Sequence, residues 1–188
     1  MKKVFKILCM AVTAAATMSA FTACDASNTC TYDESTHKLF CSEKTYSTIN
    51  IKGQIWMAEN LSAYIPDSSV CYGNDHANCD TLGRLYTWGA ATNGLCPKGW
   101  ELPSQQDFKN AFGSAVPADL KKDRPFGLLF AGFRYFDGKF ADKNASASFW
   151  TRDSYDDSRA FLVRVTDSTI TYEHFNKNIA ASVRCVKN

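Results

Sequence analysis

The sequence predicts an α+β domain in which two short helices accompany a mostly antiparallel β-sheet and disulfides staple the fold. Strand-like segments occur in runs, without a regular alternation of strand and helix. The chain has 188 residues, of which 45% are hydrophobic and 13% aromatic, so it can fill one core. It also has 8 cysteines, which is typical of an exported, disulfide-bonded protein.

The first segment of the chain is typical of an export signal. Three lysines precede an uncharged, largely apolar stretch that is too short to span a membrane comfortably. The small residues before Cys24 resemble a bacterial lipoprotein box. We therefore expect residues 1–23 to be removed and Cys24 to carry lipid, which anchors the exported protein in the cell envelope, at the outer membrane or cell surface. Ordinary cleavage that leaves Cys24 as a plain thiol is the alternative.

Charge and composition argue against a nucleic-acid partner. Residues 1–23 contain three of the 21 basic residues and none of the 19 acidic ones, so the mature chain is nearly neutral. A nucleic-acid-binding domain would carry a basic patch or stripe. The expected partners are instead the membrane, through the lipid anchor, and a polysaccharide or another envelope protein.

The cysteines predict a framework of three disulfides. Cys9 leaves with the signal, and if Cys24 carries lipid an even number remains. Six cysteines allow several pairings, and short spacing favours two of them, which leaves a third by elimination. The expected pairs are Cys30–Cys41, Cys71–Cys79 and Cys96–Cys185. A zinc site is the competing interpretation, but there is no CxxC and the three histidines are scattered.

Residues 24–45 are interpreted as a lipid-anchored tether that carries a small hairpin. The hairpin spans residues 30–41, turns at residues 34–36 and is closed by its own disulfide. Tyr32 and Leu39 are expected on one face. A platform near the membrane is one possible role for the hairpin, and a stapled flap on the main domain is the simpler interpretation.

The first half of the main domain, residues 46–188, predicts two strands and two helices. Two strands flank a turn at Lys52-Gly53, with Ile49, Ile51, Ile55 and Met57 in the alternation of a half-buried strand. A disulfide loop follows at residues 71–79. Apolar residues at helical spacing predict a first helix over residues 82–93. The second helix begins after Ser104, whose side chain forms a capping box with Asp107, and ends at Gly113.

The second half predicts strands only. One hairpin turns at Asp137-Gly138 between residues 128–136 and 139–142. A strand over residues 145–152 enters a polar loop. Another hairpin turns at Asp167-Ser168, and residues 180–186 form the last strand.

Six motifs in order resemble the Fibrobacter succinogenes major paralogous domain, which is similar to C-type-lectin-like folds. They are IWMAENL, CYGNDHANCDTLGRLYTWGAA, LCPKGWELPSQQDF, GFRYFDGKF, FWTRDSY and SVRCVKN. The resemblance covers residues 46–188 and implies a secreted or lipid-anchored bacterial protein. In that fold a cysteine near the first helix pairs with one in the final strand, which here implies Cys96–Cys185.

No catalytic, metal or cofactor site is predicted. Sugar-binding C-type lectins use a Glu-Pro-Asn or Gln-Pro-Asp loop with a Trp-Asn-Asp strand, and this chain has neither. Asp153, Asp156 and Asp157 could collect a hard cation, but a solvated acidic turn is the preferred interpretation. Formylglycine-generating enzymes share the fold and need two closely spaced redox cysteines, which Cys96 and Cys185 do not supply.

A binding surface is therefore the functional hypothesis. Exposed aromatic rings stack on sugar faces, and several aromatic and charged residues lie in or near predicted turns. The candidate ligand surface consists of Tyr135, Arg152, Asp153, Tyr155, Asp156 and Arg159. We expect a non-enzymatic envelope lipoprotein with a binding or adhesion role. The alternatives are an enzyme related to the formylglycine-generating branch and a purely structural envelope component.

Overall fold

The computed structural model describes residues 30–113, 115, 117–120 and 126–188. The predicted signal peptide, the lipid site at Cys24 and part of the polar loop 114–125 lie outside these residues. In the described part the fold is mixed, with many strands, three α-helices and three disulfides. The predicted α+β class and its disulfide staples are confirmed. No helix among these residues is long and apolar enough to cross a membrane.

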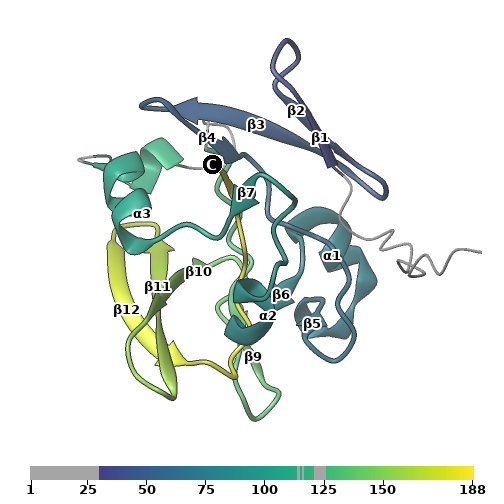
Figure 1. Cartoon of the computed structure of the whole chain (residues 1–188). Helices are drawn as coiled ribbons and strands as arrows, with labels where there is room; N and C mark the ends of the chain where they lie inside the picture. The colour runs from purple at the N-terminus through teal and green to yellow at the C-terminus, as the bar shows by residue number, and fades with distance from the viewer. Residues whose placement is uncertain (1–29, 114, 116, 121–125) are drawn as a thin grey trace, which may run out of the picture.

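The larger sheet has six strands, and its neighbours pair antiparallel in the order β1-β2-β3-β4-β13-β7. The strands are β1 (Cys30–Asp33), β2 (Lys38–Cys41), β3 (Thr45–Ile51), β4 (Gln54–Met57), β13 (Val186–Lys187) and β7 (Trp100–Glu101). The last strand of the chain, β13, thus lies between β4 and β7, where Val186 pairs with both Trp56 and Glu101. In Figure 1 the β1–β2 hairpin stands at the top of the molecule.

The N-terminal hairpin continues this sheet. Cys30 lies directly opposite Cys41 in the β1–β2 register, and their sulfurs are bonded. Leu39 is fully buried, and the ring of Tyr32 meets that of Trp100 edge-on, with 5.7 Å between the centroids. The predicted hairpin and its disulfide are confirmed. Its contacts with the core make it a packed flap.

The turn at Lys52-Gly53 joins β3 to β4 as predicted, but the four apolar residues do not share one face. Ile49 pairs directly with Trp56, so these two side chains lie on the same face of the sheet. Ile55 lies on the opposite face, because side chains alternate along a strand. Each face packs against a different core cluster. The prediction of a single apolar face was wrong because both faces contribute side chains to the core, although the hairpin is only half-buried near its turn.

The predicted helix over residues 82–93 is interrupted. The region contains β5 (Ser69–Val70), η1 (Tyr72–Asn74), α1 (His76–Leu82), β6 (Leu85–Tyr86) and α2 (Trp88–Thr92). Gly83 ends α1 with φ of 76°, and a Cβ there would lie 2.7 Å from that of Asn60. The next amide, that of Arg84, donates to the carbonyl of Leu61 at 2.9 Å. Tertiary contact with residues 60–61 therefore overrides the helical spacing, and the predicted disulfide loop 71–79 is itself partly helical.

The helix α3 (Gln105–Phe112) forms as predicted. Ser104 and Asp107 form a capping box, and Gly113 is the C-cap residue. The buried ring of Phe108 packs against Trp56 of β4 and Phe149 of β10, and the buried ring of Phe112 packs against Phe108. A short η2 (Pro117–Leu120) follows.

The second sheet has three antiparallel strands, β10 (Ser146–Ser154), β11 (Arg159–Thr166) and β12 (Ile170–Asn176). It includes the predicted hairpin at Asp167-Ser168. The hairpin at Asp137-Gly138 also forms, but its strands β8 (Phe133–Arg134) and β9 (Phe140–Ala141) have two residues each. The strand predicted from residue 128 is thus much shorter than expected.

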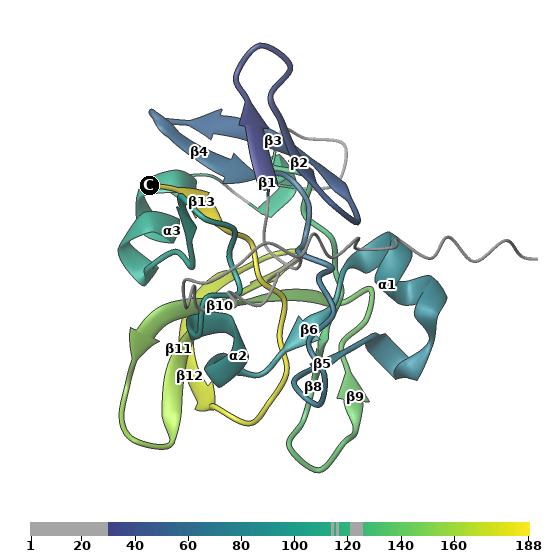
Figure 2. The ribbon, with the colours of Figure 1, turned by 45° about the vertical axis from the view of Figure 1, so that its right-hand side comes forward.

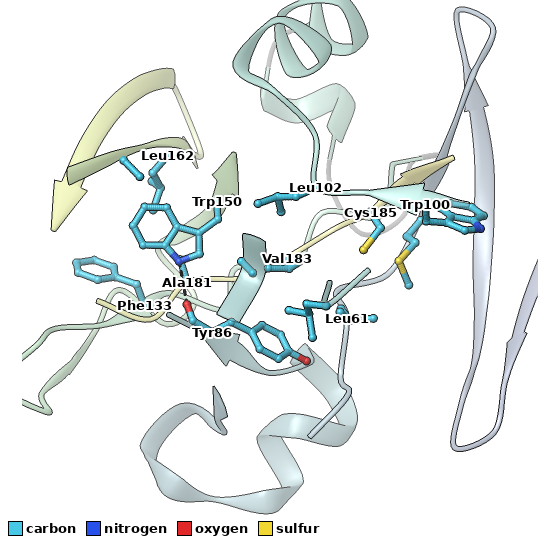
Figure 3. Packing of buried hydrophobic residues seen from close by; sticks show 14 of the residues in the cluster. Leu61, Tyr86, Trp100, Leu102, Phe133, Trp150, Leu162, Ala181, Val183 and Cys185 are labelled. Carbon is cyan, nitrogen blue, oxygen red and sulfur yellow. Dashed lines mark hydrogen bonds between the residues drawn. The ribbon is translucent and has the colours of Figure 1, made fainter. Parts of the chain in front are cut away.

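The C-terminal segment runs through the centre of the molecule. Residues 179–186 are all buried, but only Val186 and Lys187 form a ladder strand. Residues 180–182 instead make single bridges to β8, β6 and β10, so the predicted strand 180–186 was largely wrong. Figure 3 shows Ala181, Val183 and Cys185 along this segment, close to Tyr86 and Trp150. The indole nitrogen of Trp150 donates to the carbonyl of Tyr86 at 2.8 Å.

Cys185 in this segment is bonded to Cys96. The third predicted disulfide is therefore confirmed, with 89 residues of sequence separation. Closing a loop of this length stabilises the folded chain by about 4–5 kcal/mol in the chain-entropy model.

The guanidinium of Arg184 is fully buried. Its Nε donates to Oδ1 of Asn60 at 2.9 Å, and its two terminal nitrogens donate to the carbonyls of Phe126 and Gly127. It also lies 4.4 Å from the centroid of the Phe126 ring and 5.4 Å from that of Phe149. Burial lowers the pKa of Arg184 to about 9, because the charged form loses its hydration, while the carboxylate of Glu59 acts in the opposite direction.

Arg184→Met is expected to lower the free energy of unfolding by about 3 kcal/mol or more, because three buried acceptors lose their donor. Urea denaturation with the disulfides intact measures this change. Arg134→Met, at a half-buried position, is the control and should cost less than about 1 kcal/mol. Similar losses in both variants would contradict the role assigned to Arg184.

Candidate functional site

A groove of about 360 Å³ lies between α2, β7 and β10, and we call it the Trp88 groove. Its lining residues combine two indoles, an ion pair and apolar side chains. They are Trp88, Ala91, Thr92, Gly94, Leu95, Cys96, Trp100, Glu101, Leu102 and Arg152. Concave sites with a mostly apolar wall and a few fixed polar groups are the usual ligand sites of proteins.

Trp88 is held in the wall of the groove by three contacts. It is the first residue of α2, and the hydroxyl of Thr87 caps the helix by accepting from the amide of Ala90. The indole nitrogen donates to the carbonyl of Thr151 at 2.9 Å. The ammonium of Lys177 lies 4.4 Å from the indole centroid. The ring is therefore fixed in orientation, and it remains half-buried.

The rim of the groove carries an ion pair between Arg152 and Glu101, with 2.6 Å between the nitrogen and the oxygen. Arg152 also lies 3.8 Å from the carboxylate of Asp107 in the first turn of α3. The hydrogen bond to Glu101 raises the pKa of Arg152, and partial burial opposes it. The pair thus places a planar donor and a carboxylate at the edge of an aromatic wall.

The start of α3 is held by carboxylates. Asp153 accepts a hydrogen bond from the amide of Gln105 at 2.6 Å. Burial acts to raise the pKa of Asp107, but hydrogen bonds from Ser104 outweigh it and the net pKa is lowered. Asp153, which the sequence placed on the ligand surface, is thus engaged in holding a helix end.

The turn between β10 and β11 is organised by Asp156. Its carboxylate accepts hydrogen bonds from the amides of Ser158 and Arg159 and pairs with the Arg159 guanidinium at 2.6 Å. The hydrogen bond from Arg159 is the largest cause that holds the pKa of Asp156 far below its ordinary value. Lys177 donates to the carbonyls of Asp156 and Asp157 at 2.7 and 3.2 Å. Because the same ammonium contacts the Trp88 indole, Lys177 links this turn to the groove.

Tyr155 projects from the same turn and is 48% exposed. The ring of His174, near the end of β12, stacks on it with 4.0 Å between centroids and 13° between planes. The Arg159 guanidinium lies 4.8 Å from the centroid of the same ring. The ring of Phe161 meets it edge-on, with 5.3 Å between centroids. Tyr155 therefore already has three partners, and only the remaining exposed part of its side chain is open to a ligand.

The predicted ligand surface is brought together only in part. Tyr155, Asp156 and Arg159 share one turn. Arg152 and Asp153 lie farther along β10 beside α3, and Tyr135 lies in the separate β8–β9 hairpin. The sequence argument missed Trp88, Trp100 and Lys177. A tryptophan at a helix start carries no local signal of exposure, since its environment depends on residues far away in sequence.

The acidic residues of this region make hydrogen bonds within the chain. Asp156 accepts hydrogen bonds from its own turn, and Asp153 accepts one from the α3 amide. Within the described ranges, no group of three or more potential metal-ligating side chains is found.

Comparison with known proteins identifies the family of one segment. Residues 49–116 match the family model described as Fibrobacter succinogenes major domain. The predicted family is confirmed here. The match includes β4, α1, α2, β7 and α3, and hence most of the wall of the Trp88 groove, whereas Arg152 lies beyond it. No curated protein and no solved structure matches the chain. The wider extent of the Fibrobacter domain, residues 46–188, stays a prediction.

The lowered pKa of Asp156 predicts a pH dependence with a defined sign. A depressed pKa in the folded state stabilises the turn above the unfolded pKa, and this stabilisation is lost as pH falls through the folded value. Carbon-detected NMR should show that the pKa of Asp156 lies below the ordinary aspartate value of 3.8. Arg159→Gln should move its pKa upward, because the largest lowering contribution is removed. An unchanged titration in Arg159→Gln would contradict this assignment.

Proposed function

We propose that this protein is a non-enzymatic envelope lipoprotein that binds polysaccharide at the Trp88 groove. The observation that carries the proposal is the pairing of the oriented indole of Trp88 with the Arg152–Glu101 ion pair on the rim. A sugar ring has one apolar face of C–H groups and a periphery of hydroxyls. An aromatic wall with fixed donors and acceptors at its edge is complementary to both.

The position of the hairpin that follows Cys24 is consistent with a membrane anchor on one side of the domain. Cys24 precedes Cys30 by six residues, and such a stretch spans at most about 20 Å when extended. Cys30 belongs to the hairpin at the top of Figures 1 and 2, whereas the β8–β9 hairpin and the β10–β11 turn lie at the bottom. If Cys24 is acylated, the anchor lies within this distance of Cys30, and these turns lie on the side of the molecule away from the hairpin.

The cysteines support a binding role over an enzymatic one. All six cysteines in the described part of the chain are bonded in disulfides. A formylglycine-generating mechanism needs two closely spaced thiols, and Cys96 and Cys185 are bonded to each other. The same pairing supports a C-type-lectin-like fold, in which such a disulfide joins the region of the first helices to the final strand.

An envelope protein is the second candidate ligand. The observation that favours it is Phe136, which is 70% exposed at the tip of the β8–β9 hairpin beside the 41% exposed Tyr135. An exposed apolar tip suits insertion into a protein pocket, because a large aromatic anchor is the usual centre of a protein interface.

Trp88→Ala is expected to weaken binding of the full chain to insoluble cellulose or xylan by about tenfold or more, since it removes the aromatic wall. Pull-down with pectin as a third polymer, with and without a chelator, measures the affinity and its dependence on divalent cations. Tyr64→Ala is the matched control, because Tyr64 is 59% exposed and lies outside the groove. Binding that is unchanged in a folded Trp88→Ala variant would exclude the groove, and no binding to any polymer would favour the protein partner.

The lipid anchor is expected as a diacylglycerol-modified N-terminal Cys24. Intact-mass spectrometry of the exported protein checks this directly, because the acylated chain is heavier than the peptide that begins at residue 24. Cys24→Ser should leave the protein in the soluble fraction after export. An unmodified N-terminus at any other residue would contradict the anchor.

A further inference from the structure

The strand β12 forms a free edge of the second sheet. The sheet order is β10-β11-β12, so in the described part of the chain β12 pairs on one side only. In Figure 1 it lies at the outer left side of the molecule. Its seven residues make it one of the longer strands of the fold. A sheet edge of this length offers a row of backbone donors and acceptors to another chain.

The register shows which backbone groups point outward. Thr166 donates its amide to the carbonyl of Thr169, and Lys177 donates to that of Ser158, so both ends of the β11–β12 ladder are hydrogen-bonded pairs. Between them the register is unbroken, and hydrogen-bonded pairs alternate with non-hydrogen-bonded ones. The odd-numbered residues of β12 therefore bond to β11. The N–H and C=O groups of Ile170, Tyr172 and His174 point away from the sheet.

The edge has little of the usual protection against pairing, since Glu173 is the one Asp, Glu, Lys or Arg side chain in β12. Proteins commonly protect such strands with proline, lysine or a bulge. The sequence of β12, ITYEHFN, contains neither residue, and its register with β11 shows no bulge. The ammonium of Lys109 in α3 lies 5.1 Å from the centroid of the Tyr172 ring, so its contact is with this side chain.

We propose that β12 pairs with β12 of a second copy of this chain, antiparallel and centred on Tyr172. In this register each Tyr172 faces its counterpart, and Ile170 faces the partner subunit's His174. Each of these facing pairs exchanges two backbone hydrogen bonds. The two three-stranded sheets then form one continuous six-stranded sheet across a two-fold axis.

Side-chain chemistry favours this register. Glu173 lies opposite the partner subunit's Thr171, so the two glutamates do not face each other directly. The hydroxyl of Thr171 already donates to Glu173 within one chain at 2.5 Å, which shows that the two groups suit each other. At the centre, two tyrosine rings meet as an aromatic cross-strand pair, which is a favourable pair on a sheet. A single strand pair makes a small interface, so the dimer is expected to be weak.

Sedimentation velocity of the exported full chain carrying Cys24→Ser tests this pairing, from about 10 µM to about 1 mM. A monomer–dimer equilibrium is expected. Tyr172→Pro should weaken association by about tenfold or more, because the central N–H is lost while the bonds to β11 stay. Tyr172→Ala is the matched control: it keeps the N–H, and its association constant should stay within about threefold of the parent.

Hydrogen exchange keeps the proposal testable if the proline variant does not fold. In the parent chain, the amides of Ile170, Tyr172 and His174 should exchange more slowly as concentration rises, whereas that of Thr171, already bonded to β11, should not change. A parent chain that stays monomeric to about 1 mM, or equal weakening in the proline and alanine variants, would overturn the pairing. So would exchange at these three amides that does not depend on concentration.

Discussion

The buried guanidinium of Arg184 is the constraint on which much of the structure depends. A fully buried cation is costly unless its donors are satisfied, and here they are satisfied by Asn60 and by the carbonyls of residues 126–127. Among the residues that the structure describes, its hydrogen-bond acceptors are these neutral oxygens. The residues after β4, the segment before β8 and the C-terminal segment must therefore meet at one point, because moving any of them would leave a charged donor without a partner.

The C-terminal segment transmits this constraint to the Trp88 groove. Next to Arg184, Cys185 is bonded to Cys96, which lines the groove, and Val186 pairs with Glu101 on its rim. On the other side of Arg184, Ala181 pairs with Tyr86 just before α2. The groove is thus assembled around the buried C-terminal segment, so residues of the core support its walls. Such support holds an aromatic wall in one orientation and limits the entropy lost when a ligand binds.

The candidate site could be predicted only in part. Asp156 and Arg159 lie three residues apart in an acidic, turn-forming segment, and their ion pair depends on local geometry, so the sequence pointed to them. Trp88 and Lys177 lie 89 positions apart in the chain, and only folding brings the ammonium to 4.4 Å from the indole centroid. Of the residues chosen for exposure near turns, three are exposed and three are half-buried: Tyr135, Arg152 and Tyr155, and Asp153, Asp156 and Arg159, respectively. However, the sequence could not show that Tyr155 already stacks on His174.

Local backbone chemistry was determined by the sequence itself. The turns at 52–53, 137–138 and 167–168, the Ser104 capping box and the disulfide spacings each depend on neighbouring residues or on covalent pairing, and all of them formed. Tertiary structure alone decided the break at Gly83, the contribution of both faces of the β3–β4 hairpin to the core and the path of the C-terminal segment. All three features depend on which segments, far apart in sequence, pack together and exclude water. The free energy of burying Arg184 with its acceptors is likewise a property of the assembled core.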